Sequence, residues 1–342
     1  MRSLILPPLS VLYGAVTRTR LSLYRRGTFH STKLDRPVIS VGNITTGGTG
    51  KTPLVEWVAR SLAGSGKKVC ILTRGYGRDN PQQLVVVSDG RTVMTTPSEA
   101  GDEPFLLATN LLDVSAALIC SADRVAAGNE AIRRFDTDCF VLDDGFQHLR
   151  VARDLNIVTI DATNPWGGGH LLPYGRLREP LSGLSRADCI VITRTDQVNN
   201  IDSVLNEIRR FAGAVPVFKS RMRTSRIRSL DGFSDEIIPP VAAFCAIGNP
   251  RSFFNAITHE VIFQKAFPDH HRYTQTEVDS LIEAAKRVGA NSLIATAKDA
   301  VKLRSLSFSL PCYVLEIEPQ IEDEAELIRL VLNAANQRRS SA

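Results

Sequence analysis

The stretch that decides the fold is VGNITTGGTGKTP, residues 41–53, which ends in the Gly-Lys-Thr of a phosphate-binding loop. The strict pattern G-x-x-x-x-G-K-[ST] requires glycine at position 45, where this chain has Thr45. The flanks nevertheless match, because an apolar run precedes the loop and a helix is expected to begin near Thr52. Pro53 suits the first turn of that helix, where its missing N–H is no loss. The stretch therefore predicts a nucleotide-phosphate site, with an incidental glycine-rich turn as the alternative.

Each position of this loop has an expected part in binding a nucleotide. Backbone N–H groups that point inward, together with the start of a helix, attract phosphate. Lys51 is expected to reach the β- and γ-phosphates, and Thr52 to ligate Mg²⁺. The residues expected to contact the nucleotide phosphates are Thr45, Thr46, Gly47, Gly48, Thr49, Gly50, Lys51 and Thr52.

The rest of the chain alternates short apolar runs with segments of helical length. Such runs are typical of parallel strands buried on both faces of an α/β sheet. All six cysteines lie in or beside them, in no C-x-x-C pair, so we expect buried thiols in a reducing compartment, with neither disulfides nor structural zinc. The runs are PVISVGN, KVCILT, AALIC, CFVLDDG, NIVTIDA and CIVITRTD, and a second series begins at VAAFCAIG.

A chain of 342 residues with 43% hydrophobic residues is long enough for about two domains. A basic segment that ends in two prolines separates the two α/β series. We therefore expect an N-terminal helix at 1–27, a phosphate-loop domain at 28–218, a connector at 219–240 and a smaller α/β domain at 241–342. Two lobes leave a cleft between them, which is a common place for a ligand.

The N-terminus carries a largely apolar run of thirteen residues at 4–16, shorter than the about 20 residues that span a bilayer. A helix from Pro8 to Gly27 would place its apolar residues on one face, with arginines after them. That helix could lie at a membrane interface or dock on its own domain, and the segment alone leaves both open. A signal peptide is disfavoured because the arginines follow the apolar run. The net charge of +5 is too mild to suggest nucleic-acid binding.

The run CFVLDDGFQH supplies the carboxylates that a phosphate loop needs for its metal. Asp143 and Asp144 follow a strand and should face the same crevice as the loop. The sequence does not decide which of them contacts Mg²⁺, and the alternative is a plain Asp-Asp-Gly turn.

Further polar clusters stand at expected strand ends but assign no role alone. SEAGDEP, CSADR, GGGHLLPYGRLREP and FPDHHRYT are the segments concerned. The adjacent histidines His270 and His271 are a poor metal pair, although one could orient a carboxylate base across the cleft. VITRTD bears only a weak resemblance to the N/T-K-x-D element by which GTPases recognise guanine, because Arg194 replaces the lysine.

Taken together, GNITTGGTGKTP, RGYGR, GDEP, DDGFQH, GHLLPYGRLREP and FPDHHRYT resemble the tetraacyldisaccharide 4'-kinases, the lipid A 4'-kinases of Gram-negative bacteria. The resemblance covers nearly the whole chain. It implies a P-loop kinase fold with a second α/β lobe, and transfer of phosphate from ATP with Mg²⁺ to the 4'-hydroxyl of a tetraacylated glucosamine disaccharide 1-phosphate. The implied partners are this lipid A precursor and the anionic cytoplasmic face of the inner membrane, bound peripherally or monotopically. No nucleic acid and no protein partner are expected.

The resemblance also implies roles for single residues. Asp102 would be the base that accepts the sugar hydroxyl proton, and His270 would hold it. Asp144 and Glu179 would join Thr52 as magnesium ligands. The residues that would support the nucleotide and the transferring phosphoryl group are Lys51, Asp143, Gln147, Glu103 and Arg124. The chain departs from the family's T-E-K-D at Ala297, which leaves no carboxylate there.

Two alternatives belong to other functional classes. VITRTD would suit a nucleotide-dependent switch that prefers GTP and transfers nothing to lipid. A small-molecule kinase with a purely structural N-terminal helix would not bind anionic vesicles.

Overall fold

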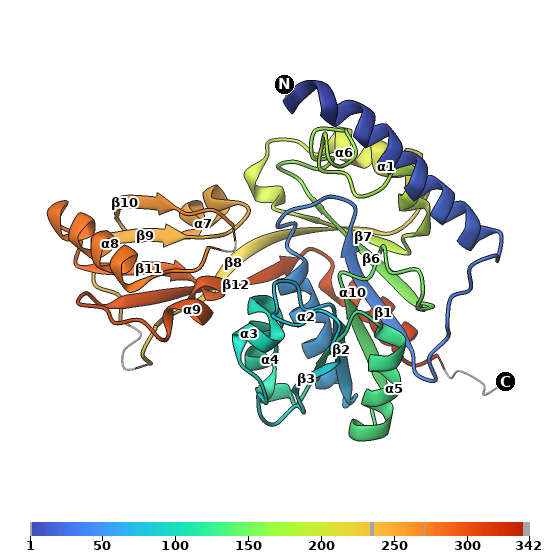
Figure 1. The fold of residues 1–342 in the computed structure, drawn as a ribbon, viewed down its shortest axis with the longest axis horizontal. Coiled ribbons are helices and arrows are strands. Elements are labelled where there is room, and N and C mark those ends of the chain that lie inside the picture. Colours follow the sequence, from blue (N-terminus) through green and yellow to red (C-terminus); the bar gives the residue numbers. More distant parts are fainter. Residues whose placement is uncertain (1, 233–235, 270, 338–342) are drawn as a thin grey trace.

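The computed structural model describes residues 2–232, 236–269 and 271–337 as two α/β lobes (Figure 1). Within these residues the strands form one twelve-stranded sheet, which runs through both lobes in the order β10-β9-β11-β12-β8-β7-β6-β1-β5-β2-β4-β3. The apolar runs in the sequence correspond to its strands, and all six cysteines are buried.

The first lobe contains seven strands and carries the phosphate loop at its centre. β1 lies between β5 and β6 and pairs with both in parallel, whereas the edge strand β3 is antiparallel to β4. The loop thus opens at the middle of the sheet, beside the carboxyl end of β5. The strands are β1 (Val38–Asn43), β2 (Val69–Thr73), β3 (Val85–Ser88), β4 (Ala117–Cys120), β5 (Cys139–Asp143), β6 (Leu155–Asp161) and β7 (Cys189–Thr193).

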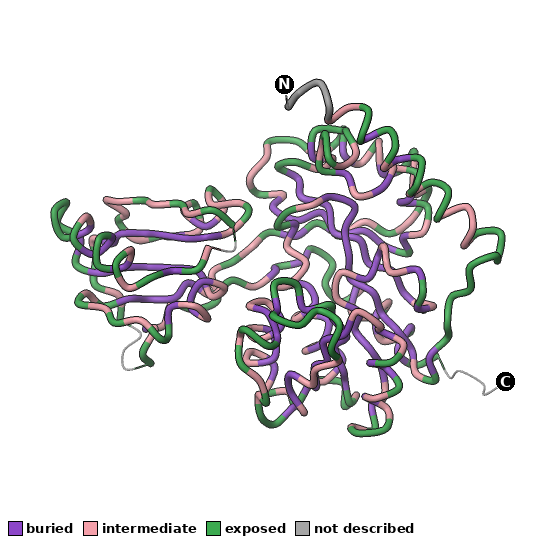
Figure 2. The backbone as a smooth tube through the Cα atoms, viewed as in Figure 1, coloured by how far each residue is buried: buried purple, intermediate pink, exposed green. Residues whose placement is uncertain are grey.

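Helices cover both faces of this part of the sheet because its strands are apolar on both sides. In β1, Ile39 and Val41 pack on the side of α2, α4 and α10, while Val38 packs on the side of α5. Figure 2 shows the buried strands running through the middle of the lobe. The helices are α2 (Lys51–Gly64), α3 (Pro97–Ala100), α4 (Asp102–Asn110), α5 (Arg124–Phe135), α6 (Asp202–Ala212) and α10 (Glu324–Ala335).

The second lobe is a smaller parallel sheet with helices on both faces. Val241 and Ala243 of β9 face the side of α7, whereas Ala242 and Phe244 face the side of α8 and α9. Its elements are β9 (Val241–Cys245), α7 (Pro250–Ala256), β10 (Val261–Ala266), α8 (Gln275–Arg287), β11 (Ser292–Thr296) and α9 (Ala297–Leu303).

Two long antiparallel strands, β8 (Val217–Ser229) and β12 (Cys312–Ile321), join the lobes (Figure 1). Half of the segment expected as a loose connector is therefore strand, and two of its arginines pair with acids on β12. Arg223 pairs with Glu318 and Arg228 with Glu316. β12 also carries the chain back, so that α10 packs on the first lobe. α10, which the sequence assigns to the domain at 241–342, thus covers the part of the sheet that lies in the first lobe.

The N-terminal helix α1 (Arg2–Arg25) begins earlier than expected and includes Pro7 and Pro8. It docks on the first lobe through small and polar residues. The Ser10 hydroxyl donates to the carbonyl of Leu171 at 2.8 Å, and Gly14 lets the same leucine approach closely. Leu12 and Val16 are each 61% exposed, so the apolar face points to solvent (Figure 2). None of the described helices is both long and apolar enough to cross a membrane.

We predict that Gly42→Ala lowers the free energy of unfolding by about 1–3 kcal/mol, the usual cost of overpacking a core. A methyl group at this position in β1 would lie 2.7 Å from the backbone nitrogen of Phe146, in the segment after β5. Urea unfolding measures the effect. Gly64→Ala is the matched control, because nothing lies within 4 Å of its added methyl, and alanine favours the helix. Equal unfolding free energies for the two variants would contradict the close packing at Gly42.

Candidate active site

Buried polar side chains at the ends of three strands hold the phosphate loop in place. Asn43, which ends β1, donates from Nδ2 to the hydroxyl of Thr49 at 2.9 Å. That hydroxyl also lies 2.9 Å from the hydroxyl of Thr159 on β6, and the Thr193 hydroxyl on β7 donates to the Thr49 carbonyl at 3.1 Å. Gly50 has φ 78° as the residue before α2. The loop is therefore fixed by its own lobe and starts a helix, as a phosphate cradle requires.

Asp144 lies between two cations beside this loop. Its carboxylate accepts from Nη1 of Arg178 at 2.6 and 2.8 Å, and Oδ1 lies 3.6 Å from Nζ of Lys51. Burial acts to raise the pKa of Asp144, but Lys51 and Arg178 outweigh it and lower the pKa to about 2. The carboxylate is therefore ionised throughout the physiological range.

The neighbouring Asp143 has the opposite electrostatics. Burial and the charge of Asp144 raise the pKa of Asp143 to about 6, even though the Thr73 hydroxyl donates to it at 2.8 Å. Glu103 adds to the same shift, which places the start of α4 within electrostatic reach of β5. Two adjacent carboxylates with separated pKa values are suited to holding a cation.

A strap at residues 171–179 ties the loop to these carboxylates. The N–H of Thr46 donates to the carbonyl of Arg176, and the N–H of Arg178 donates to that of Ile44, both at 2.8 Å. The Arg178 guanidinium then reaches Asp144. Arg178 lies in the segment GGGHLLPYGRLREP, but nothing local in the sequence indicates its partner 34 residues away.

Glu179, at the end of the strap, is 1% exposed and has both carboxylate oxygens paired. Oε1 accepts from Nε2 of Gln147 and Oε2 from Nη2 of Arg186, each at 2.7 Å. Gln147 also donates to the carbonyl of Asn43. To contact a metal, Glu179 would have to exchange one of these partners.

The oxygen donors at the loop suit Mg²⁺, which takes one or two carboxylates plus phosphate and water oxygens. Thr52 in the first turn of α2, Asp143 and Asp144 supply such donors. Among the described residues no group of three or more His, Cys, Asp or Glu side chains forms a metal cage. The donor set therefore fits a metal held largely by a bound phosphate chain.

Arg124 is the first residue of α5, and it is only 4% exposed. Burial lowers the pKa of Arg124, although the negative charge of Asp143 acts to raise it. Its Nη1 donates to the carbonyl of Ala122 at 3.3 Å, whereas in the part of the chain that the structure describes its buried Nε has no partner. A buried cation with an unused donor suits an anionic group.

Asp102 and Glu103 form the first turn of α4, after Gly101 with φ 92°. Both face α9 of the second lobe. Nζ of Lys302 lies 3.1 Å from Oδ2 of Asp102, and Nζ of Lys298 lies 2.8 Å from Oε1 of Glu103. The structure thus brings the predicted base to the boundary between the lobes. The predicted partner His270 lies outside the described residues.

The weak guanine-like element VITRTD has a structural use. Arg194 is 7% exposed, pairs with Asp161 at the end of β6, and donates from Nε to Ser252 Oγ of the second lobe at 3.1 Å. Arg194, which stands where a guanine site would have lysine, is therefore already bound to Asp161 and Ser252.

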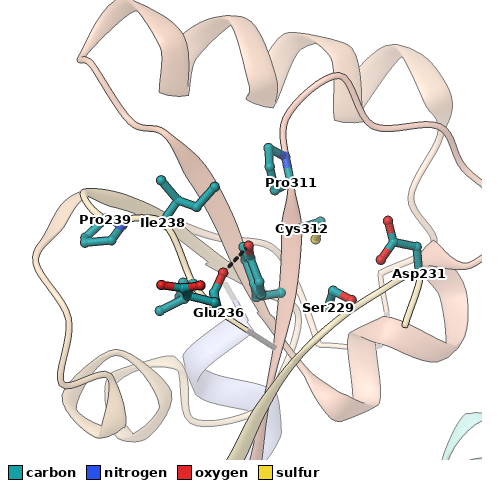
Figure 3. A pocket seen from close by; sticks show the side chains of 9 residues that line it. Ser229, Asp231, Glu236, Ile238, Pro239, Pro311 and Cys312 are labelled. Atoms are coloured by element: carbon teal, nitrogen blue, oxygen red, sulfur yellow. Dashed lines mark hydrogen bonds between the residues drawn. The ribbon is translucent and has the colours of Figure 1, made fainter. Parts of the chain in front are cut away.

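Two hollows differ in their suitability for a nucleotide. A polar cavity of about 190 Å³ adjoins the loop and is lined by residues that include Thr46, Asp161 and Arg176. A larger one of about 500 Å³ is lined by residues that include Ser229, Ile238 and Pro311 (Figure 3). There the Tyr313 hydroxyl donates to the Glu236 carbonyl at 2.6 Å, and the charged lining residues are Asp231 and Glu236. An acidic lining is unsuited to phosphate, so the smaller cavity is the relevant one.

Comparison with known proteins identifies the family of this chain. The sequence model of the family described as tetraacyldisaccharide-1-P 4'-kinase matches residues 2–336. The chain belongs to this family. It is 41% identical to the tetraacyldisaccharide 4'-kinase of Geobacter sulfurreducens, over 93% of this chain and 89% of that relative. The corresponding protein of Geobacter metallireducens is 42% identical, over 87% and 88% of the two chains.

A solved structure of the same family confirms the fold. LpxK from Aquifex aeolicus, crystallised in complex with ATP, superposes with a TM-score of 0.76 at 32% identity, over 98% of this chain and 99% of that one. The family resemblance and the fold class expected from the sequence, a phosphate-loop α/β sheet with a smaller lobe and an N-terminal helix, are both confirmed.

We predict that Asp143→Asn and Asp144→Asn shift the melting temperature of the ligand-free protein in opposite directions at pH 7. The pKa of Asp143 is raised from 3.8 to about 6, so ionised Asp143 destabilises the fold. Its replacement should stabilise the protein above about pH 6, with no gain below about pH 4. The pKa of Asp144 is lowered to about 2, so its replacement should destabilise above about pH 4, less so toward pH 2.

Thermal unfolding between pH 3 and pH 8 measures both variants, each serving as the control for the other. Shifts of the same sign at pH 7 would contradict the charge arrangement around Asp144.

Proposed function

We propose that this protein is an ATP-dependent lipid kinase. It transfers the γ-phosphoryl group of ATP to the 4'-hydroxyl of a tetraacylated glucosamine disaccharide 1-phosphate, the lipid A precursor. The observation that carries the proposal is the pairing of a phosphate loop and two strand-end aspartates with a carboxylate, Asp102, at the boundary with the second lobe. Membership of the kinase family supports the same reaction.

The residues divide the work of phosphoryl transfer, which depends mainly on positioning and on charge neutralisation. The loop N–H groups and Lys51 would bind the phosphate chain of ATP, and the buried Arg124 would stabilise charge on the transferring group. Asp102 would accept the proton of the sugar 4'-hydroxyl. The 4'-oxygen would then bond to the γ-phosphorus of ATP, while the bond between that phosphorus and the bridging oxygen breaks and ADP leaves. His270 is proposed to hold Asp102.

A bound Mg²⁺ would offset the negative charge that develops on the phosphoryl group during transfer. We assign its protein ligands to Thr52 and Asp144, with Glu179 as a further ligand that must first leave Gln147 or Arg186. Asp143 would support the metal site from beside Asp144, and Gln147 would orient Glu179. Glu103 would support the nucleotide.

The acceptor lipid lies in a membrane, and α1 is proposed as the surface that reaches it. The helix contacts its own lobe through Ser10, Tyr13 and Gly14, which leaves Leu12 and Val16 exposed. An exposed apolar stripe beside arginines suits peripheral binding to an anionic interface. We therefore place the protein at the cytoplasmic face of the inner membrane.

The direct test is incubation with γ-labelled ATP, Mg²⁺ and the disaccharide lipid. Label in the lipid, at the 4' position, is the expected result. A folded protein that binds ATP and never labels the lipid would refute the proposal, and a strong preference for GTP without transfer would favour a nucleotide-dependent switch.

We predict that Lys51→Ala lowers turnover about 10²–10³-fold, the usual cost of one preorganised electrostatic contact. Lys68→Ala is the control, because Lys68 is exposed and pairs with Asp136 on the surface. Steady-state label transfer measures both, with thermal unfolding to verify the fold. Turnover of Lys51→Ala near that of the control would exclude the proposed role of the loop.

We predict that the double variant Leu12→Ser/Val16→Ser binds anionic vesicles at least about tenfold more weakly. Burial of one such side chain contributes about 1.5–3 kcal/mol, and about 1.4 kcal/mol is tenfold in affinity. Vesicle sedimentation measures the change. Val288→Ser, which replaces a 49% exposed valine after α8 in the second lobe, should bind as the wild type does. Unchanged sedimentation of the double variant would count against α1 as the membrane surface.

A further inference from the structure

We propose that Lys302 is a positioning residue for Asp102, supplied from the second lobe, which orients the base only while the two lobes lie together. The inference rests on the proposed function, because it takes Asp102 as the base. It concerns a residue of α9 that lies 200 positions from Asp102 in the sequence.

The contact between Lys302 and Asp102 is close and largely shielded from water. Nζ of Lys302 lies 3.1 Å from Oδ2 of Asp102, and the two side chains are 7% and 23% exposed. Exposed ion pairs contribute little, whereas a shielded pair at this distance restricts both side chains. Among the described residues Nζ of Lys302 has no hydrogen-bond partner, so the ion pair restrains the Oδ2 side of the carboxylate by charge and not by a hydrogen bond.

The second lobe holds Lys302 in a defined place through a buried aspartate one turn earlier. Asp299 is fully buried and accepts hydrogen bonds from the N–H of Ala246 after β9 and from the hydroxyl of Tyr273. It also accepts from the hydroxyl of Thr296, the residue that caps α9. The start of α9 is thus anchored to its own lobe, so Lys302 moves with that lobe.

A carboxylate base needs one oxygen directed at the hydroxyl whose proton it accepts. Because the Lys302 ammonium lies on the Oδ2 side of the carboxylate, its charge would keep Oδ2 toward α9 and direct Oδ1 to the hydroxyl. Misplacement of a catalytic group by about 1 Å can cost about 10²-fold in rate, so an unfixed Asp102 would be a much poorer base.

Lys298 provides a matched comparison on the same helix. It lies one turn before Lys302 and pairs across the same lobe boundary with Glu103 at 2.8 Å, and with Asp269 of its own lobe at 3.4 Å. Its replacement removes an ion pair between the lobes but leaves the partner of Asp102 in place. Comparison of the two lysines therefore separates orientation of the base from general attachment of the lobes.

The test is a double-mutant cycle on label transfer to the lipid, with Lys302→Gln and Lys298→Gln made in the wild type and in Asp102→Asn. If Lys302 acts through Asp102, Lys302→Gln should lower kcat about 10–100-fold in the wild type but less than about twofold in Asp102→Asn. The KM for ATP should stay within about twofold. The kcat of Lys302→Arg, which keeps the charge, should be at least about threefold higher than that of Lys302→Gln. Lys298→Gln should have the same effect in both backgrounds.

The inference is overturned if Lys302→Gln lowers kcat by the same factor in both backgrounds, or if Lys302→Arg is no better than Lys302→Gln. Should Lys302→Gln fail to fold, as judged by thermal unfolding, Lys302→Met and Lys302→Arg give the same comparison in the same cycle. A wild-type protein that never labels the lipid would instead refute the proposed function, which the wild-type arm alone reveals.

Discussion

The carboxylate of Asp144 between Lys51 and Arg178 is the interaction on which the site depends. A partly buried carboxylate is costly unless cations compensate it, and here the cations come from α2 and from the strap at 171–179. One ion cluster thereby fixes the phosphate loop, the end of β5 and the strap. The hydroxyl of Tyr13 on α1 donates to the carbonyl of Arg178 at 2.8 Å, so the helix that faces outward shares a segment with the phosphate site.

The local features of this site could be predicted from the sequence, because each depends on neighbours along the chain. The loop around Lys51 and the strand end at Asp143 and Asp144 are of this kind. Two ion pairs could not be predicted from the sequence, since they join segments that only the folded sheet brings together. These are the pairs of Asp144 with Arg178 and of Asp102 with Lys302. No pattern along the sequence distinguishes these cations from ordinary surface ones.

The same limit explains two differences between expectation and structure. The sequence left open whether α1 hides its apolar face, and the outcome depends on Ser10 and Gly14, whose small size lets the opposite face dock. α10, assigned by the sequence to the smaller domain, packs on the first lobe because β12 is long enough to return the chain there. At Ala297 the missing glutamate leaves the start of α9 intact, since Thr296 caps the helix and Asp299 anchors it.

The central claim is that the phosphate loop and the Asp102 carboxylate act on one acceptor hydroxyl from two sides. The most direct measurement is a crystal structure with Mg²⁺, a non-hydrolysable ATP analogue and the disaccharide lipid. The account predicts the 4'-oxygen within about 3 Å of an Asp102 oxygen and in line with the γ-phosphate at Lys51. A 4'-hydroxyl directed at another side chain, with Asp102 turned away from the γ-phosphate, would contradict it.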